Sequence, residues 1–564
     1  MVEDYAPLGM RWVTLLRGAG SEIASGGVAL AAALAVARGE LRAGFPVDDA
    51  WIHMVYGLAL RNGEGLAYDT NVPATGCTSP LWAVVAAAAH VLAFAAEPSR
   101  TAALALKLLG VLSFVATAVL SARLARACAP RRAWGPAVAL VAGAAVAASP
   151  VLAFAAASGM EVCLASALML ASLLAAVRVR SVLAGALAGV AVLARPEALV
   201  IVPVVTVLAA LSPARRARVG AKGSGRLGRT MSAGVAAAVP IGALALRNWR
   251  VSGRPLPSTF YSKAHAFAPS AAVADLRLGF VDLLGRVPPT SFLPLWLLVG
   301  AALVMGVLSL AKGPRPARPV LWRRLNVAAL ALAGVVYVVG IALTTRLSSP
   351  EVFYFQRYAL PAVALLVVSA VCAGAWIVDG LGRPAARARA RPWLKLAALV
   401  TVLVGLGLEV SAWAGEHARY ASDARDIDAV QVSVGRFLQR TLPPDAIVWS
   451  QDAGAIRYWG RRPTVDLAAL NTPQVFHGSA VSPEWWPDTV VVAVGVLQVH
   501  APPGLFDPIG QVRAPSNPDD PLGLQVVLRC RAAGAGDGED RAFTITHGPD
   551  RMATGECARR GESR

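Results

Sequence analysis

The sequence predicts an all-α polytopic membrane protein that carries a small α/β domain at its C-terminal end. Three observations support this fold class. The 564 residues are 56% hydrophobic and only 15% charged, whereas soluble domains carry roughly 25% charged residues. Apolar runs long enough to cross a bilayer core of about 30 Å recur up to residue 413. After residue 414 these runs stop, and the chain becomes polar and rich in proline.

The apolar runs predict about 11 transmembrane helices, because backbone groups in lipid must be paired within their own segment. The first helix, 23–37, ends in Ala35-Val36-Ala37, which also resembles a signal-peptidase site. We interpret it as an uncleaved helix, since an external loop over 38–99 with two adjacent carboxylates follows directly. The other predicted spans are 101–122, 133–151, 160–177, 181–194, 197–211, 231–249, 290–311, 325–344, 359–378 and 393–413.

The net charge of +19 follows from membrane orientation rather than from binding of nucleic acid. Five short stretches together hold 22 basic residues and no acidic residue, which is typical of cytoplasmic loops. All five fall on the side of the N-terminus if the apolar segment 79–96 is a juxtamembrane or re-entrant helix rather than a crossing. This predicts a multi-pass protein of a bacterial-type cell membrane with a cytoplasmic N-terminus. The stretches are 123–132, 178–180, 212–229, 312–324 and 383–395.

Two domains are expected, a transmembrane catalytic domain over 1–425 and an extracytoplasmic α/β domain over 426–564, called the C-terminal domain below. Within the latter, Asp428 to Arg440 is typical of an amphipathic helix. Ala446 to Trp449 and Val490 to Val496 are typical of buried strands. An odd number of crossings places this domain outside the cell.

Two of the six cysteines, Cys530 and Cys557, lie in the C-terminal domain on either side of a strand-like segment. A disulfide between them would suit an oxidising compartment. The chain has no paired Cys-x-x-Cys motif and no spacing typical of a zinc site.

Two adjacent carboxylates, Asp48 and Asp49, follow the first apolar helix. Like charges this close raise the pKa of one carboxyl group, which suits a general base. The alternative is an ordinary helix start, since Asp is favoured at the N-cap and in the first turn. If a helix starts at Asp48, then Asp49, His53 and Tyr56 share one face. His53 and Tyr56 therefore become candidate substrate-binding residues.

Further ionisable and aromatic residues fall on the same predicted side of the membrane. Arg357, Arg195 and Lys263 could hold a lipid phosphate, which arginine binds through a bidentate fork. The alternatives are snorkelling anchors for the basic residues and contacts between helix ends for the acidic ones. The remaining candidate substrate-binding residues of this set are Glu161, Glu197, Tyr261 and Tyr358.

These residues lie in short motifs that follow one another along the chain. The motifs are Asp48-Asp49-Ala50-Trp51-Ile52, Gly65-Leu66-Ala67-Tyr68, Thr78-Ser79-Pro80-Leu81-Trp82, Ser158-Gly159-Met160-Glu161, Arg195-Pro196-Glu197, 256–263 and Arg357-Tyr358-Ala359-Leu360-Pro361, followed in the C-terminal domain by 452–458 and 462–467. Together they resemble the GT-C membrane glycosyltransferases that use polyprenyl-phosphate sugars. The resemblance covers most of the chain and is greatest to bacterial terminal arabinofuranosyltransferases, with protein mannosyltransferase-like enzymes as a further group.

The resemblance implies transfer of a sugar from a polyprenyl-phosphate donor with inversion at the anomeric carbon. The base would be an Asp of the first external loop, Asp48, with Asp49 as its close rival. The acceptor would be a hydroxyl of a cell-envelope glycan, a lipid or a protein. No cofactor and no metal are implied, although a paired Asp could bind Mg²⁺ or Ca²⁺. Cys77 departs from the family pattern, in which an aromatic residue tends to follow the glycine.

The competing prediction is a transporter or flippase of lipid-linked sugars, since such proteins also bury ionisable groups in the membrane. Transporters usually contain internal repeats with broken helices, and the sequence shows no such repeat. They also rarely carry a large external C-terminal domain. The sequence favours the enzyme and leaves the sugar and the acceptor open.

Overall fold

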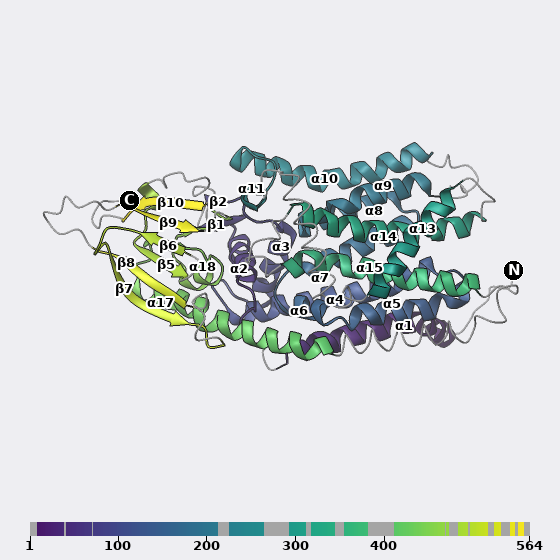
Figure 1. Cartoon of the computed structure of the whole chain (residues 1–564), viewed down its shortest axis with the longest axis horizontal. Helices are drawn as coiled ribbons and strands as arrows, with labels where there is room; N and C mark the ends of the chain where they lie inside the picture. Colours follow the sequence, from purple (N-terminus) through teal and green to yellow (C-terminus); the bar gives the residue numbers. More distant parts are fainter. Residues whose placement is uncertain are drawn as a thin grey trace.

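The computed structural model shows a long helical body at one end and a sheet-containing domain at the other (Figure 1). All structural statements below concern the residues that it describes. These are 8–38, 41–69, 72–212, 225–263, 293–311, 317–344, 355–381, 411–468, 470–472, 483–493, 497–516, 524–531, 542–547 and 551–557.

The helical body consists of helices that run along the long axis of the molecule, with the N-terminus at its far end (Figure 1). A short helix, η1 (Arg132–Trp134), leads into α5. The helices are α1 (Leu8–Val36), α4 (Arg100–Cys128), α5 (Gly135–Ala147), α6 (Pro150–Ala157), α7 (Val162–Val177), α8 (Ser181–Ala194), α9 (Ile201–Leu211), α10 (Arg226–Ser252), α13 (Leu293–Leu310), α14 (Arg318–Thr344) and α15 (Phe355–Leu381).

Within the described residues, five helices are long and apolar enough to cross a membrane, namely α4, α10, α13, α14 and α15. A sixth crossing results if α5 and α6, bent by 59°, form one span. Helices α7 and α8 have 16 and 14 residues, fewer than the roughly 20 that a span needs. The predicted number of 11 crossings is therefore not confirmed, and most of the segment 393–413 lies outside the described residues.

Glycine residues let helices of the body approach each other closely. A Cβ added at Gly185 of α8 would lie 2.0 Å from the carbonyl oxygen of Ala233 in α10. One added at Gly110 of α4 would lie 2.2 Å from the carbonyl oxygen of Ala156 in α6. Lipid tails are as apolar as leucine, so close contact between small residues stabilises helix pairs in a membrane. A larger side chain at either glycine would separate its helix pair.

A layer of short elements lies between the helical body and the sheets (Figure 1). Its helix α3 corresponds to the predicted surface segment 79–96, has 13 residues and packs against α2. A Cβ added at Gly57 of α2 would lie 2.6 Å from Ala86 Cβ of α3, so the two helices are in close contact. The elements of this layer are α2 (Asp48–Arg61), β1 (Ala67–Asp69), β2 (Val72–Pro73), α3 (Pro80–Leu92), η2 (Pro196–Val200) and α11 (Ser258–Lys263).

A continuous helix over 411–441 runs from the helical body into the C-terminal domain (Figure 1). It contains a π-helical turn, η5 (Asp428–Val432), and ends with α17 (Ser433–Thr441). The predicted amphipathic helix from Asp428 to Arg440 is thereby confirmed. The expected domain boundary after residue 425 lies within this helix, so one continuous helix connects the two parts of the chain.

The C-terminal domain contains a five-stranded sheet of order β4-β3-β5-β8-β7 and a three-stranded sheet of order β10-β9-β6. β3 pairs in parallel with β4 and β5, and the other pairs are antiparallel. The two strands expected from the sequence correspond to β3 and β5, and residues 494–496 of the second prediction lie outside the described residues. The elements are β3 (Val448–Ser450), α18 (Ala455–Gly460), β4 (Thr464–Asp466), η7 (Pro483–Trp485), β5 (Thr489–Ala493), β6 (Leu497–His500), β7 (Phe506–Arg513), β8 (Leu524–Cys530), β9 (Ala542–His547) and β10 (Arg551–Glu556).

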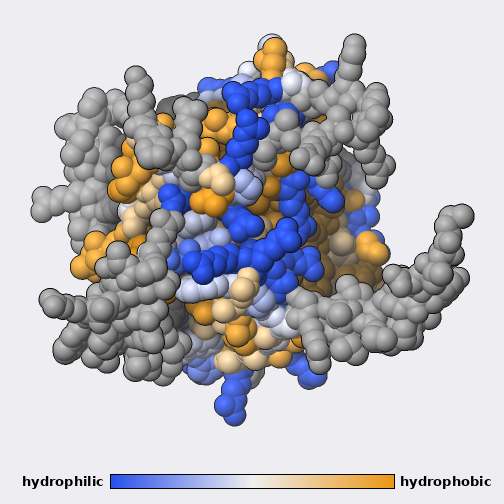
Figure 2. Space-filling view, turned by 90° about the vertical axis from the view of Figure 1, so that its right-hand side faces the viewer, coloured by the Kyte–Doolittle hydropathy of each residue, from blue (hydrophilic) through white to orange (hydrophobic). Residues whose placement is uncertain are grey.

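Basic residues gather at the end of the body that carries the N-terminus. Figure 2 views this end and shows hydrophilic side chains across its middle with hydrophobic ones around them. Helices α4 and α7 end here and α10 and α14 begin here (Figure 1). The predicted basic stretches 123–132 and 178–180 lie at the ends of α4 and α7. The stretches 212–229 and 312–324 are described only in part, and 383–395 lies outside the described residues. The C-terminal domain lies at the opposite end of the molecule (Figure 1).

Cys530 and Cys557 form the disulfide that the sequence suggested, across a separation of 27 residues. Cys530 ends β8 of the five-stranded sheet, and Cys557 directly follows β10 of the three-stranded sheet. The bond therefore joins the two sheets of the C-terminal domain covalently.

Replacing both cysteines by serine should lower the free energy of unfolding of the C-terminal domain by about 3 kcal/mol, because the unfolded chain regains the freedom of an open loop. Thermal and denaturant unfolding of the full chain measures this loss. A reducing agent should destabilise the wild type and leave the double variant unchanged. Equal stability of the two proteins under oxidising conditions would contradict the prediction.

Candidate functional site

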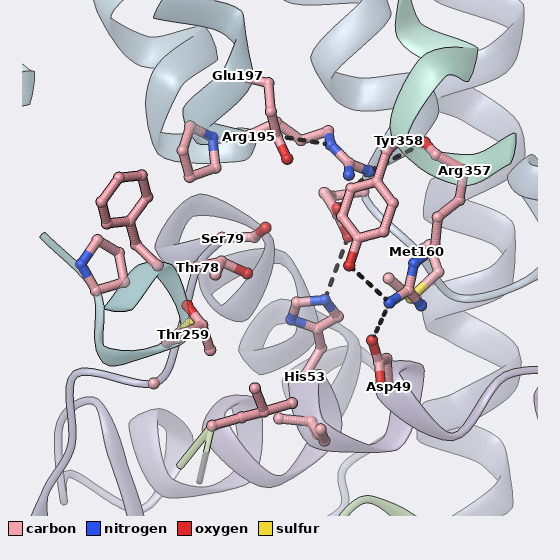
Figure 3. Close-up of a pocket in the computed structure, with 18 of the residues that line it drawn as sticks. Asp49, His53, Thr78, Ser79, Met160, Arg195, Glu197, Thr259, Arg357 and Tyr358 are labelled. Atoms are coloured by element: carbon pink, nitrogen blue, oxygen red, sulfur yellow. Dashed lines mark hydrogen bonds and ion pairs between the residues drawn. The ribbon is translucent and has the colours of Figure 1, made fainter. Parts of the chain in front are cut away.

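A cavity of about 480 Å³ lies where the helical body, the short-element layer and the C-terminal domain meet. Its size falls in the range of about 300–1,000 Å³ that is typical of ligand sites. Figure 3 shows side chains from several elements converging on it. The polar part of its wall includes Asp49, His53, Tyr56, Thr78, Ser79, Glu161, Arg195, Glu197, Thr259, Tyr337, Arg357, Tyr358 and Asn471, and the apolar part includes Leu199, Val200, Leu256, Phe260 and Ile341.

Helix α2 contributes one face to this cavity. It begins at Asp48, as predicted, and both carboxylates stand in its first turn, where they interact favourably with the helix dipole. Asp49, Ile52, His53 and Tyr56 line the cavity, and their spacing of three and four residues places them on one side of the helix. Successive residues of a helix are rotated by about 100°, so Asp48 points to a different neighbour than Asp49.

Asp49 is the carboxylate of α2 that reaches the cavity, with 33% of its side chain exposed. Its Oδ2 accepts a hydrogen bond from Nη2 of Arg357, which comes from the first turn of α15. The same Nη2 lies 3.2 Å from the hydroxyl oxygen of Tyr358 (Figure 3). A carboxylate that could act as a base and a guanidinium that could bind phosphate thus stand side by side.

Asp48 does not line the cavity. Its Oδ2 accepts a hydrogen bond from the backbone N–H of Gly454 and its Oδ1 from that of Ala455, both at 2.8 Å. Burial and the nearby carboxylate of Asp452 raise the pKa of Asp48 to about 8. The sequence favoured Asp48 over Asp49 as the candidate base, whereas the geometry gives Asp48 a contact with the C-terminal domain and leaves the cavity to Asp49.

Arg195 stands at the centre of a buried ionic network on the opposite wall. With 3% of its side chain exposed, its Nη1 lies 2.9 Å from Glu161 Oε1 and its Nε 3.3 Å from Glu197 Oε2. Glu161 Oε2 lies 3.2 Å from Nε2 of His53, and the Arg195 guanidinium lies 5.1 Å from the centre of the Tyr358 ring. The predicted site residues therefore contact one another across the cavity (Figure 3).

The backbone conformations of Gly159 and Arg195 explain how two of the motifs place their side chains in the cavity wall. Gly159 has a φ of +79°, a conformation that glycine adopts without strain, and the turn it makes brings Met160 and Glu161 into the cavity wall. Arg195 is extended, with φ −149° and ψ 125°, because the residue before a proline is disfavoured in the helical region. Pro196 thus ends α8 and turns Arg195 into the site.

Besides Asp48, the predicted site residue Tyr261 does not line the cavity in the part of the chain that the structure describes. The ring of Tyr261 packs against Phe260 at 5.6 Å and under the guanidinium of Arg254 at 5.0 Å, and it is not part of the described lining. Lys263 is the last residue of α11, and its side chain lies outside the described part of the chain.

Several lining residues were not singled out from the sequence. Thr78, Ser79 and Thr259 lie inside the recognised motifs, so their small hydroxyl side chains could have been chosen there. Asn471 gave no such signal, because it follows the last motif of the C-terminal domain and reaches the cavity only through the tertiary fold. It accepts a hydrogen bond from the Tyr56 hydroxyl at 2.9 Å.

A protein-family model, described as a domain of unknown function (DUF8728), matches residues 420–507. No curated protein matches the sequence. The family model includes the turn that reaches the cavity through Asn471, and its description gives no activity.

Solved structures match most of the chain. ArnT from Cupriavidus metallidurans bound to undecaprenyl phosphate aligns with 94% of this chain and 100% of its own, at 17% identity and a TM-score of 0.52. The Archaeoglobus fulgidus oligosaccharyltransferase tethered with an acceptor peptide aligns with 83% of this chain and 68% of its own, at 12% identity and a TM-score of 0.51. The arabinofuranosyltransferase AftD from Mycobacteria aligns with 96% of this chain and 43% of its own, at 16% identity and a TM-score of 0.45. The first two show that the chain has the fold of GT-C glycosyltransferases.

Proposed function

We propose that the chain is an integral membrane glycosyltransferase that moves a sugar from a polyprenyl-phosphate donor to an acceptor hydroxyl. The observation that supports this most is the pairing of Asp49 with Arg357 in a cavity whose other side is apolar. The fold supports the same class of reaction, because ArnT, which has this fold, was solved with undecaprenyl phosphate. The acceptor would belong to a cell-envelope glycan, a lipid or a protein.

The apolar side of the cavity suits the lipid part of such a donor. Leu199, Leu256 and Phe260 line it and are 52%, 41% and 44% exposed, so a polyprenyl chain would remove their side chains from contact with water or headgroups at a gain of about 25 cal/mol per Å² of apolar surface covered. Arg357 would bind the phosphate through its guanidinium fork. The guanidinium of Arg195, held in place by Glu161 and Glu197, would contact the same phosphate.

In the proposed reaction Asp49 accepts the proton of the acceptor hydroxyl as its oxygen attacks the anomeric carbon of the donor sugar. The bond from that carbon to the phosphate oxygen breaks, and the electron pair leaves with the polyprenyl phosphate. Arg357 stabilises the charge that develops on this leaving group. A single displacement of this kind inverts the anomeric carbon. His53, Tyr56 and Tyr358 would shape the space around the two sugars.

We also propose the orientation that the sequence predicted, with 11 crossings, a cytoplasmic N-terminus and an extracytoplasmic C-terminal domain in a bacterial-type cell membrane. The basic end of the body and the position of the C-terminal domain at the opposite end support it (Figures 1 and 2). Transfer would then take place on the extracytoplasmic face, where the cavity meets the C-terminal domain.

The full chain in lipid nanodiscs, supplied with cell membranes as a source of acceptors and with several radiolabelled polyprenyl-phosphate sugars, tests the proposal. At least one donor should lose its label to a membrane glycan, lipid or protein. The proposal fails if every donor stays intact. Movement of intact lipid-linked sugar across sealed vesicles under the same conditions would identify a transporter or flippase instead.

Arg357→Lys should raise the apparent KM for the donor by about 10-fold to 100-fold, because lysine keeps the charge but loses the fork, and a hydrogen bond to a charged group contributes about 1.5–3 kcal/mol. Donor titrations in nanodiscs measure the change. The matched control is Arg131→Lys, whose side chain is 59% exposed at the far end of the body. An unchanged donor KM in both Arg357→Lys and Arg357→Ala would leave Arg357 without a role in donor binding.

A further inference from the structure

Helix α2 has one end fixed by the C-terminal domain through Asp48. The N-cap of α18 is Gly454, which has no side chain with which to cap the helix. The side-chain oxygens of Asp48 take this role by accepting hydrogen bonds from the backbone N–H groups of Gly454 and Ala455. The N-cap of α2 itself, Val47, makes no side-chain cap. The first residue of α2 therefore caps a helix that lies about 400 residues further along the chain.

The contact at Gly454 is tight. A Cβ added there would lie 2.2 Å from the backbone oxygen of Asp48 and 2.6 Å from its Oδ2. The φ of Gly454 is −83°, which other residues also adopt, so the close approach rather than the backbone angle requires glycine. An alanine at this position would push α18 and the start of α2 apart.

A second contact fixes α2 two turns later. Asp466 is buried and accepts hydrogen bonds from the N–H groups of Ala468, Leu470 and Asn471. It also accepts one from Nδ2 of Asn471 at 2.9 Å, which turns the side-chain oxygen of Asn471 to the Tyr56 hydroxyl. Asn471 is 3% exposed and Tyr56 is fully buried, so this contact is shielded from water.

Aromatic packing joins the two contacts into one interface. The ring of Trp51 lies 5.2 Å from that of Tyr458 and 5.6 Å from that of Trp459, both in α18. Trp51 is fully buried. Three positions of α2, at residues 48, 51 and 56, are thus held by the C-terminal domain, and the cavity residues Asp49 and His53 lie between them.

From these contacts we infer that the C-terminal domain positions Asp49, and that Asp48 and Asn471 are positioning residues rather than catalytic ones. The inference rests on the proposed function. A 14-residue helix is marginal on its own in water, so its rotation and depth depend on tertiary contacts. A change of about 1 Å in the position of a reacting group can lower a rate about 100-fold.

The test compares Asp48→Ala, Asp48→Asn and Asp49→Asn in full-length protein in nanodiscs, with the radiolabelled donor that the wild type consumes. Asp48→Ala removes both hydrogen bonds to α18 and should lower kcat about 10-fold to 100-fold. Asp48→Asn keeps one acceptor oxygen and should recover most of that loss, to within about 10-fold of the wild type. The donor KM should change less than twofold in all three, and Asp507→Ala, an exposed site in β7, should match the wild type.

Further variants test the interface at Gly454, Asn471 and Tyr56. Gly454→Ala should lower kcat as Asp48→Ala does, whereas Gly234→Ala, where a Cβ meets nothing within 4 Å, should not. Asn471→Ala and Tyr56→Phe remove the same hydrogen bond from opposite sides, so their effects on kcat should not add in the double variant. The rate of amide hydrogen exchange over residues 48–61 of α2 should rise in Gly454→Ala and in Asn471→Ala. This measurement detects the loosening of α2 independently of enzyme activity.

Three outcomes separate the alternatives. If Asp48→Asn lowers kcat as deeply as Asp49→Asn, Asp48 is a base and the inference is wrong. If Gly454→Ala and Asn471→Ala keep the wild-type kcat and exchange rates, the C-terminal domain does not position α2. If the wild type consumes no donor, the proposed function fails, and the exchange measurements then decide the positioning separately.

Discussion

Asp49→Asn should lower kcat about 10²-fold to 10⁴-fold, the range that general-base catalysis typically contributes. Asparagine keeps the size and polarity of the side chain but cannot accept the proton of the acceptor hydroxyl. Arg357 would lose its anionic partner on Asp49, so the donor KM should stay equal or fall. Initial rates at saturating donor, measured beside a donor titration, separate the two effects.

The matched control for this prediction is Asp507→Asn, an exposed carboxylate paired with Arg531 in the C-terminal domain. It should leave kcat and donor KM as in the wild type. Thermal unfolding of both variants shows whether the protein remains folded. A wild-type kcat in a folded Asp49→Asn protein would remove this carboxylate from the proposed chemistry.

Arg195→Ala should lower the free energy of unfolding by about 3–5 kcal/mol, because it leaves the buried carboxylate of Glu161 and the partly buried one of Glu197 without their shared cation. The side chains of Glu161 and Glu197 are 5% and 24% exposed. Water can therefore solvate the unpaired carboxylate of Glu161 less than that of Glu197. Denaturant titration of the protein in detergent measures the loss. Activity should fall with it, since His53 contacts Glu161 in the same network.

Arg531→Ala is the corresponding control, because the side chains of its ion pair with Asp507 are 57% and 47% exposed. Exposed pairs contribute about 0–1 kcal/mol, so this variant should unfold close to the wild type. A loss of less than about 1 kcal/mol in Arg195→Ala would show that the buried network stabilises no more than a surface pair does.

Several features of this protein follow from local sequence alone. Apolar runs specify helices because lipid offers no partner for a free backbone group, and each of these runs that the structure describes lies on a helix. Short, continuous apolar runs within a polar segment specify the strands β3 and β5, which are buried at every position. The acidic pair at Asp48 marks a helix start for the same local reason, and α2 begins there.

The cavity itself was only partly predictable. The motifs supplied Asp49, His53, Glu161, Arg195 and Arg357, all of which line it. The sequence could not show that Glu161 would hold Arg195 together with Glu197, since Glu161 lies 34 residues before Arg195, at the start of α7. Nor could it show that Tyr261 would pack against Phe260 and Arg254, because that depends on the angle at which α11 follows α10.

The sequence by itself determined that this chain forms membrane helices followed by a C-terminal domain, and it suggested the disulfide and the gathering of the charged motifs at one site. Only the tertiary structure showed that Asp49, and not Asp48, lines the cavity. The two residues are neighbours in the chain, but a rotation of about 100° per residue sends one to α18 and the other into the cavity. That choice depends on Gly454 and Asn471, which lie about 400 residues away along the chain and meet α2 only in the folded protein.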